Sequence, residues 1–413
     1  MRRFSRLVVP LSLTVILLGA QIASVPALSD PTTGAVHGPL HLEIPWIYLL
    51  LAPLFTSWDA VSMLSMSRLQ GFLLGVGVLF ITWRVGQAAL GRRLTLKREL
   101  RALAVALVLL ASFVLAGLLW HRPMLSLGGT GASDIVTDFH SHTNVSHDVR
   151  DTWMRGFDAE ANRRWHARAG FDVAFITDHN LVSRESGVGG REAVLRATSD
   201  STILCPGIEI SAWRAHVVLL GDTIPVDRRR YNGSLEELLA LLQTSDSAYG
   251  ALSLASLPEY RRNHWSRLDL LTRAGLDGFE IVNASPKANE ITQAERDSVV
   301  ALARLHNRFV VGVSDSHGWG ATSMVWNLVR SPSGSAAPDL CAAVLRRLRT
   351  GFPAVQIIER HRLRPDAWWP SWLTPLGAVW ESWRSMGWTL AGSWLVWIWV
   401  SALILRPRRS KGW

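Results

Sequence analysis

The chain has 413 residues, of which 48% are hydrophobic and 18% are charged, and its formal net charge is +10. This composition excludes an intrinsically disordered protein, which would be poorer in apolar residues. The only two cysteines, Cys205 and Cys341, stand far apart in the sequence, which argues against a disulfide scaffold and against a thiolate zinc finger. A bound metal ion would therefore have to use histidines and carboxylates.

The positive charge is concentrated outside the central part of the chain. Residues 134–360 carry 25 Lys and Arg against 27 Asp and Glu, whereas the remaining segments carry 18 against 6. A nucleic-acid-binding domain would have a basic face on its folded part, so we expect no nucleic-acid partner. Basic residues that flank apolar segments are typical of membrane anchors, so we expect a lipid bilayer as a partner.

The N-terminal segment predicts the first contact with a membrane. Residues 1–28 begin with basic residues, continue with an apolar run and end in small residues, which fits either a signal peptide or a first transmembrane helix. A membrane region is expected over residues 40–120. Its first apolar stretch, 44–56, is too short to cross a bilayer and contains two prolines, so it should be interfacial or re-entrant.

Three further apolar segments predict transmembrane helices. Two of them lie at about 66–83, where Arg68 would snorkel to the interface, and at 103–120. The third is residues 388–405, and the Trp-rich segment 351–387 before it should lie on the bilayer surface. The alternative is that some of these segments are buried helices of a soluble protein.

Clusters of basic residues set the expected orientation of these helices. They stand before the first apolar segment, between the spans 66–83 and 103–120, and after residue 405. The positive-inside rule places all three clusters in the cytoplasm and residues 121–387 outside it. We therefore expect an integral protein of the plasma (inner) membrane with an extracytoplasmic central domain.

The central region predicts strands that alternate with helices, in an α/β fold. Apolar runs predict strands at 135–139, 171–177, 202–210, 215–220, 278–282 and 309–313. Helices are predicted at 152–169, 235–243, 266–274 and 294–306. Such alternation is typical of a parallel sheet, open or closed into a barrel, with its chemistry at the carboxyl ends of the strands.

Polar residues follow four of these strands. His140 and His142 are two residues apart on a strand, so both imidazoles point to one side and can reach one ion. The other strand ends read ITDHN with His179, GIEI with Glu209, and SDSHG with Asp315 and His317. One such element would be unremarkable, but four at one rim predict a metal centre.

The motifs DxHxHTxxS, ITDHN, GIEI and SDSHG resemble, in order, those of the PHP (polymerase and histidinol phosphatase) superfamily of metal-dependent phosphoesterases. The resemblance covers residues 134–350. It implies a distorted (β/α)7 barrel, here flanked by transmembrane helices, that holds two or three divalent ions (Mn, Zn or Fe). It also implies a phosphate-ester substrate, a phosphomonoester or phosphodiester hydrolysed by a metal-activated water.

The resemblance also implies which residues bind each ion. The first ion would take His140, His142, Asp315 and Glu209, and Glu209 would bridge to a second ion that also takes His216. The third would take His147, His179 and His317, with Asp148 as the alternative to His147. Asp138 and Asp178 would orient neighbouring imidazoles. For catalysis we expect Glu209 to bridge, His179 or His317 to protonate the leaving group, and Arg261 and Arg262 to clamp phosphate.

One position departs from the family pattern. Where the family has His-Pro at a strand end, this chain has Leu257 before Pro258, so the second ion loses a ligand. Weak binding, a water ligand, or His264 from the following loop are the possible consequences. The alternative function is therefore a metal-binding module that has lost catalysis. We also expect Cys205 to be a buried strand residue and not a nucleophile.

Overall fold

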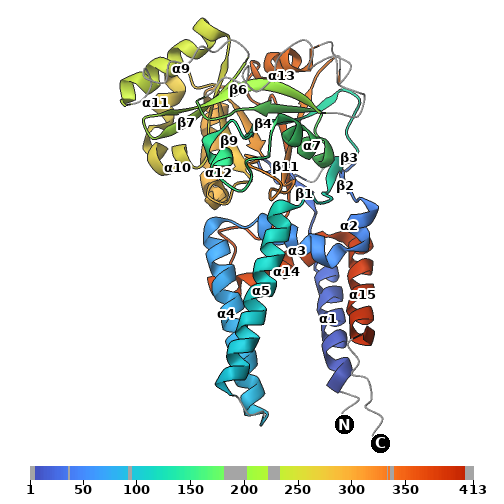
Figure 1. Cartoon of the computed structure of the whole chain (residues 1–413). Helices are drawn as coiled ribbons and strands as arrows, with labels where there is room; N and C mark the ends of the chain where they lie inside the picture. The colour runs from blue at the N-terminus through green and yellow to red at the C-terminus, as the bar shows by residue number, and fades with distance from the viewer. Residues whose placement is uncertain are drawn as a thin grey trace, which may run out of the picture.

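The computed structural model describes residues 5–35, 38–91, 95–180, 202–221, 233–332, 334 and 339–404. An α/β part stands on a set of long helices that run away from it, and short helices lie at the junction (Figure 1). Most basic residues of the three clusters that set the expected orientation, such as Arg92 and Arg406, lie outside the described residues.

The α/β part is built on one curled sheet of ten strands. Their order is β1-β12-β11-β4-β5-β6-β7-β8-β9-β10. The strands are β1 (Leu28–Ser29), β4 (Asp134–Ser141), β5 (Val173–Ile176), β6 (Ile203–Ala212), β7 (Ala215–Leu220), β8 (Leu252–Ala255), β9 (Gly278–Asn283), β10 (Phe309–Val313), β11 (Val325–Arg330) and β12 (Gln356–Arg360). The sheet thus continues beyond residue 350, where we expected the domain to end.

The expectation of a parallel sheet is only partly right. β4, β5 and β6 run parallel, as do β8, β9 and β10. β7 is antiparallel to both of its neighbours, because β6 and β7 are joined by a tight turn at Trp213 and Arg214, both with positive φ, in place of a helical crossover. β11 and β12 are antiparallel as well, so the sheet is mixed.

Curling brings the last strand of the sheet back beside β4 and β11. The amide side chain of Asn327 on β11 receives a hydrogen bond from the Gly312 backbone N–H at 2.9 Å and donates to the Gly312 and Thr137 carbonyls. This buried amide satisfies backbone groups of β10 and β4 where the two strands form no regular ladder. The result is a curled half-barrel with the carboxyl ends of β4, β5 and β10 close together.

Helices surround this sheet (Figure 1). They are α7 (Ala159–Ala169), α9 (Leu235–Tyr249), α11 (Leu268–Arg273), α12 (Gln293–Leu305) and α13 (Leu340–Leu348), with the short elements α6 (His147–Arg150), α10 (Glu259–Asn263), η3 (Trp265–Arg267) and η4 (Ala288–Glu290). Helix α7 begins seven residues later than we expected from the pattern over 152–169. The reason is a helix cap, because the Asp158 side chain accepts a hydrogen bond from the Ala161 N–H.

Three of the described helices are long and apolar enough to cross a membrane. They are α4 (Met66–Ala89), α5 (Leu96–Leu119) and α15 (Gly387–Ile404), which correspond to the three predicted spans. Side chains on their outer faces are exposed, for example Leu74 on α4 at 58% and Val108 on α5 at 63%. Such a surface is costly in water but suits contact with lipid chains.

The N-terminal helix α1 (Ser5–Ile22) is integrated into the protein. It runs beside α15 (Figure 1), and its Leu17 and Ala20 are fully buried in a cluster with Ala391 of α15. The chain that follows α1 pairs as β1 with β12. These contacts make α1 a packed element of the described fold.

Short helices form a layer between the long helices and the α/β part (Figure 1). This layer contains α2 (Trp46–Leu50), α3 (Ala52–Ser62), η6 (Ser371–Leu373) and α14 (Thr374–Ser385), with the small sheet of β2 (His41–Glu43) and β3 (Ser126–Gly128) nearby. The stretch 44–56, expected to be interfacial, forms α2 and the first half of α3, with Tyr48 and Phe55 fully buried.

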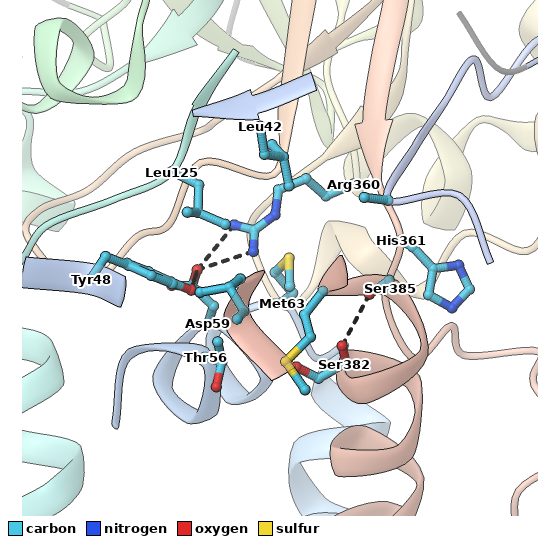
Figure 2. Close-up of a pocket in the computed structure, with 13 residues that line it drawn as sticks. Leu42, Tyr48, Thr56, Asp59, Met63, Leu125, Arg360, His361, Ser382 and Ser385 are labelled. Carbon is cyan, nitrogen blue, oxygen red and sulfur yellow. Dashed lines mark hydrogen bonds and ion pairs between the residues drawn. The ribbon is translucent and has the colours of Figure 1, made fainter. Parts of the chain in front are cut away.

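Asp59 of α3 joins this layer to the α/β part. Its carboxylate pairs with the Arg360 guanidinium at 3.1 Å, as Figure 2 shows, and with Arg122 at 3.4 Å. It also accepts hydrogen bonds from the Tyr48 hydroxyl and from Thr322. Burial alone would raise the pKa of Asp59, but the two arginines outweigh it and lower that pKa.

Two expectations from the sequence are wrong. Arg68 does not snorkel, because it is buried and donates to the carbonyls of Arg364, Pro365, Ala367 and Trp369. It therefore anchors the start of α4 to the Trp-rich segment. The two cysteines, although far apart in the sequence, do form a disulfide, between Cys205 on β6 and Cys341 on α13, with a Cα–Cα distance of 5.7 Å. Cys205 is a buried strand residue, as expected.

Candidate metal centre

Five strands deliver the predicted site residues to one end of the curled sheet. β4 supplies His140 and leads into His142, while His179 follows β5. Glu209 lies on β6 and His216 on β7. Asp315 and His317 follow β10, where Asp315 adopts a left-handed φ of 46° and its backbone N–H donates a hydrogen bond to the His140 carbonyl at 2.9 Å. Such a strained conformation at a strand end is typical of functional sites.

The first cluster of donor atoms consists of His140, His142, Glu209 and Asp315. The Nε2 atoms of His140 and His142 lie 3.0 Å apart. Oε2 of Glu209 lies 3.1 Å from Nε2 of His140 and 3.3 Å from Nε2 of His142. Oδ1 of Asp315 is 3.6 and 3.3 Å from the same two nitrogens. Ligands about 2.1 Å from a common ion are separated by such distances.

Glu209 lies at the centre of the site and uses both of its oxygens. Oε2 faces His140, His142 and, at 3.3 Å, Nε2 of His179, while Oε1 lies 2.9 Å from Nδ1 of His216. A carboxylate with its two oxygens in two clusters can bridge two ions, which an imidazole cannot easily do. The bridging arrangement expected for Glu209 is therefore geometrically available.

A further cluster is centred on Asp148. Its Oδ2 lies 2.7 Å from Nε2 of His317 and 3.1 Å from Nε2 of His179. His147 is exposed, and its ring centre is 5.1 Å from that of His179. Of the two alternatives left open by the sequence, the structure therefore brings Asp148 into the cluster and leaves His147 at its edge.

The carboxylates dominate the electrostatics of the site. Burial alone would lower the pKa of His140, but Glu209, Asp315 and Glu280 outweigh it and raise that pKa well above its usual value. Burial would likewise lower the pKa of His142, yet Asp315 and Glu209 raise it to about 10. A pocket that draws protons so strongly onto buried imidazoles is a favourable place for cations of any kind.

Glu280 on β9 is a site residue that the sequence analysis missed. It is completely buried, and its Oε1 lies 2.6 Å from Nδ1 of His140. Its other oxygen accepts from the Leu257 N–H at 2.8 Å and from the Asn283 amide at 2.9 Å. A single acidic residue inside the apolar run GFEIVN was the available signal. The pair of carboxylate and histidine orients the metal-facing nitrogen.

The two aspartates expected to orient imidazoles hold the framework of the site. Asp178 accepts hydrogen bonds from the N–H and the hydroxyl of Thr143, directly after His142, both at 2.7 Å. Asp138 binds Nε2 of His166, at 2.8 Å, and the Ser314 N–H, at 3.0 Å. Neither aspartate contacts an imidazole of the clusters, so they fix the loops that carry the candidate ligands.

Apolar packing surrounds Leu257, which precedes Pro258 at the end of β8. Leu257 is buried, and the proposed substitute His264 points elsewhere, because its Nε2 lies 3.1 Å from the Trp213 carbonyl. Glu259, at the start of α10, is the nearer candidate. Its Oε2 is shielded from solvent, has no hydrogen-bond partner, and lies 3.7 Å from Nδ1 of His216. Burial raises the pKa of Glu259.

The two arginines expected to clamp phosphate lie outside the donor clusters. Arg261 pairs with Glu295 of α12 at 2.9 Å. Arg262 is exposed on α10. The structure shows no contact between either guanidinium and the candidate ligands, so it gives the expected clamp no support.

Three groups of side chains among the described residues could hold a metal ion. They are His140, His142 and Asp315; His142, Asp148 and His317; and His142, His179 and Glu209. The donor atoms in each group lie within 4.8 Å of one another. The buried Nδ1 atoms of His142 and His179 have no hydrogen-bond partner, whereas the Nε2 atoms of both rings face carboxylates of the clusters. The mixed imidazole and carboxylate set fits divalent ions such as Zn, Mn or Fe.

Comparisons with known proteins add little. No protein-family model matches the sequence, and a search of curated proteins finds no match. Among solved structures, PsfC from Pseudomonas syringae PB-5123 matches with 18% sequence identity and a TM-score of 0.37. The match covers 60% of this chain and 96% of the PsfC chain. A second solved structure is an amidohydrolase from Chromobacterium violaceum with bound sulfate and no metal. It matches with 16% sequence identity and a TM-score of 0.28, and the match covers 44% of this chain and 87% of the amidohydrolase chain. Likenesses this weak carry no functional argument.

Proposed function

We propose that the protein is a membrane-tethered, metal-dependent hydrolase of phosphate esters. The observation that carries this proposal is the convergence of Glu209 with four histidines, each oxygen of its carboxylate facing different imidazoles. The PHP-like order of the motifs around these residues supports phosphate esters as the substrate class.

Divalent ions bound there would supply a Lewis acid for the phosphoryl oxygens and would lower the pKa of water. The chain's own residues would hold and orient those ions. Glu280 fixes the ring of His140, and Asp178 fixes the loop after His142. Of the two histidines expected to protonate the leaving group, His317 has the more exposed side chain, 34% against 7% for His179, so it would be the more accessible proton donor when its ring holds no ion.

Two features support an extracytoplasmic orientation of the α/β part. The disulfide between Cys205 and Cys341 is typical of proteins outside the reducing cytosol. The N-terminal end of α1, the C-terminal end of α15 and the adjoining ends of α4 and α5 all lie at the end of the long helices that is remote from the α/β part (Figure 1). The basic clusters adjoin these positions in the sequence, so the positive-inside rule gives the same orientation. Reporter fusions after Leu90 and after Trp120 would test it.

Hydrolysis is tested with the full-length protein in detergent. Chelator-treated protein should release nitrophenol from a nitrophenyl phosphate ester only after Mn²⁺ is restored. His140→Ala should abolish both release and tight metal binding, whereas Glu160→Gln on the exposed face of α7 should change neither. Bound metal without turnover of any phosphate ester would contradict the proposal and would favour the metal-binding module, for which Leu257 is the specific observation.

A further inference from the structure

A cavity of about 740 Å³ connects the metal centre with the long helices. Asp148, Asp315 and His317 line one end of it. The rest of its wall is formed largely by apolar side chains of α3, α4 and α5, among them Trp58, Leu73, Leu110, Val114 and Leu118. One continuous space therefore has a metal-binding end and a hydrocarbon-like end.

We infer that the substrate is an amphiphile, a phosphate ester of a long hydrocarbon chain, whose tail lies in this cavity while its phosphate lies at the metal centre. The inference rests on the proposed function and names the substrate class of the same site. A small water-soluble ester would fill the metal end alone and leave the apolar wall in contact with water, which is unfavourable.

The charge distribution along the cavity defines which end takes the phosphate. Gln70, Thr152 and Thr322 are among its uncharged polar residues, and no Lys or Arg stands among the described residues that line it. An anionic head group therefore finds positive charge only where divalent ions would bind. The opposite orientation, with the phosphate between α4 and α5, would bury an unpaired charge among apolar side chains.

The cavity extends along the helices that face lipid. From Leu118 to Leu110 the wall of α5 covers about 12 Å along the helix axis. Leu73 on α4 and Val114 on α5 line the cavity and are also 60% and 40% exposed at the surface. The apolar space thus borders the surface that contacts lipid chains, and a tail can enter from the bilayer without crossing water.

The test compares alkyl phosphates of increasing chain length as substrates for the full-length Mn²⁺-loaded protein in lipid nanodiscs. kcat/KM should rise by about two- to fourfold per added methylene until the cavity is filled. Leu73→Trp on α4 and Val114→Trp on α5, which place a larger side chain at the cavity wall, should reduce the ratio of kcat/KM for dodecyl over ethyl phosphate at least tenfold. Metal content and thermal midpoint report whether each variant is folded.

Matched controls separate the cavity from simple partitioning into the bilayer. Leu74→Trp and Val108→Trp replace exposed residues of the same two helices that do not line the cavity, so they should keep the chain-length ratio of the unmodified protein. Equal ratios in Leu73→Trp and Leu74→Trp would overturn the inference.

Binding of non-hydrolysable dodecyl phosphonate keeps this test independent of turnover. If no ester is hydrolysed, the proposed function fails, but tight dodecyl phosphonate binding that Leu73→Trp weakens and Leu74→Trp preserves would still support the amphiphile. Hydrolysis of small esters with equal phosphonate affinity in all variants would leave the proposed function standing and overturn the amphiphile.

Discussion

Oε1 of Glu280 lies 2.6 Å from Nδ1 of His140, so a buried carboxylate behind this candidate metal ligand determines which ring nitrogen carries the proton. This leaves Nε2 of His140 unprotonated and directed at Glu209 when an ion is bound. Glu280 on β9 thereby holds the ring of His140 on β4, whose Nε2 belongs to the first donor cluster.

Glu280→Gln should weaken metal binding about 10- to 100-fold, because loss of this partner's charge lowers the basicity of His140 and frees its ring. Metal titration by calorimetry measures the effect. Glu295→Gln is the matched control, because Glu295 pairs with Arg261 away from the clusters. The metal affinity of this variant should equal that of the unmodified protein. An unaltered affinity in Glu280→Gln would show that the ring is held by its other contacts.

Glu259→Gln should lower the amount of metal that the protein retains after desalting. The reason is that Oε2 of Glu259 has no hydrogen-bond partner and lies 3.7 Å from Nδ1 of His216, so this carboxylate can serve as a ligand beside it. Mass spectrometry of the metal content gives the ratio of ion to protein at each metal concentration. Identical ratios in Glu259→Gln and the unmodified protein would exclude Glu259 as a ligand.

Replacing both cysteines by serine should destabilise the protein by about 2–5 kcal/mol, because the disulfide closes a loop with a sequence separation of 136 residues and restricts the unfolded chain. Thermal unfolding followed by Trp fluorescence measures the change, and reductant should have the same effect on the unmodified protein. A midpoint that responds to neither treatment would mean that the bond is absent in the folded protein.

Asp59→Asn should destabilise the junction by about 3–5 kcal/mol, since the buried guanidinium groups of Arg122 and Arg360 would lose their shared carboxylate. Asp151→Asn is the control, because Asp151 and its partner Arg150 are both exposed and that pair contributes little. Thermal midpoints in detergent compare the two variants. Equal midpoints would show that the junction does not depend on this ion pair.

Low pH should reduce the free energy of unfolding partly through Glu359. This carboxylate pairs with Arg296 at 2.6 Å and with Arg362 at 3.1 Å. Burial alone would raise the pKa of Glu359, but the arginines lower it to about 2. Because this folded-state pKa lies below the unfolded value, the carboxylate's stabilisation is complete above about pH 4.5 and is lost as the pH falls towards about 2.

The difference in unfolding midpoint between the unmodified protein and Glu359→Gln isolates this contribution. It should be constant near neutral pH and should shrink below about pH 4.5. A difference that stays constant down to pH 3 would contradict the assignment.

The sequence by itself predicted most of the site residues, because the signal is local. Each apolar run forms a strand, and the polar residue directly after it must lie at the strand's end. His140, Asp315 and their neighbours could therefore be assigned to one rim without knowledge of the packing. The three long helices were predictable for the same reason, since length and apolarity are properties of a continuous segment.

Only the tertiary structure decided the features that join distant segments. Three of these features depend on which surfaces meet in the folded chain. They are the antiparallel strands β7, β11 and β12, the Cys205–Cys341 disulfide, and the hydrogen bonds from Arg68 to backbone carbonyls. Glu280 is recognisable as a site residue only once β9 is placed beside His140. The cavity from His317 to Leu73 likewise has no counterpart in any single segment, because a space between packed elements is a property of their arrangement.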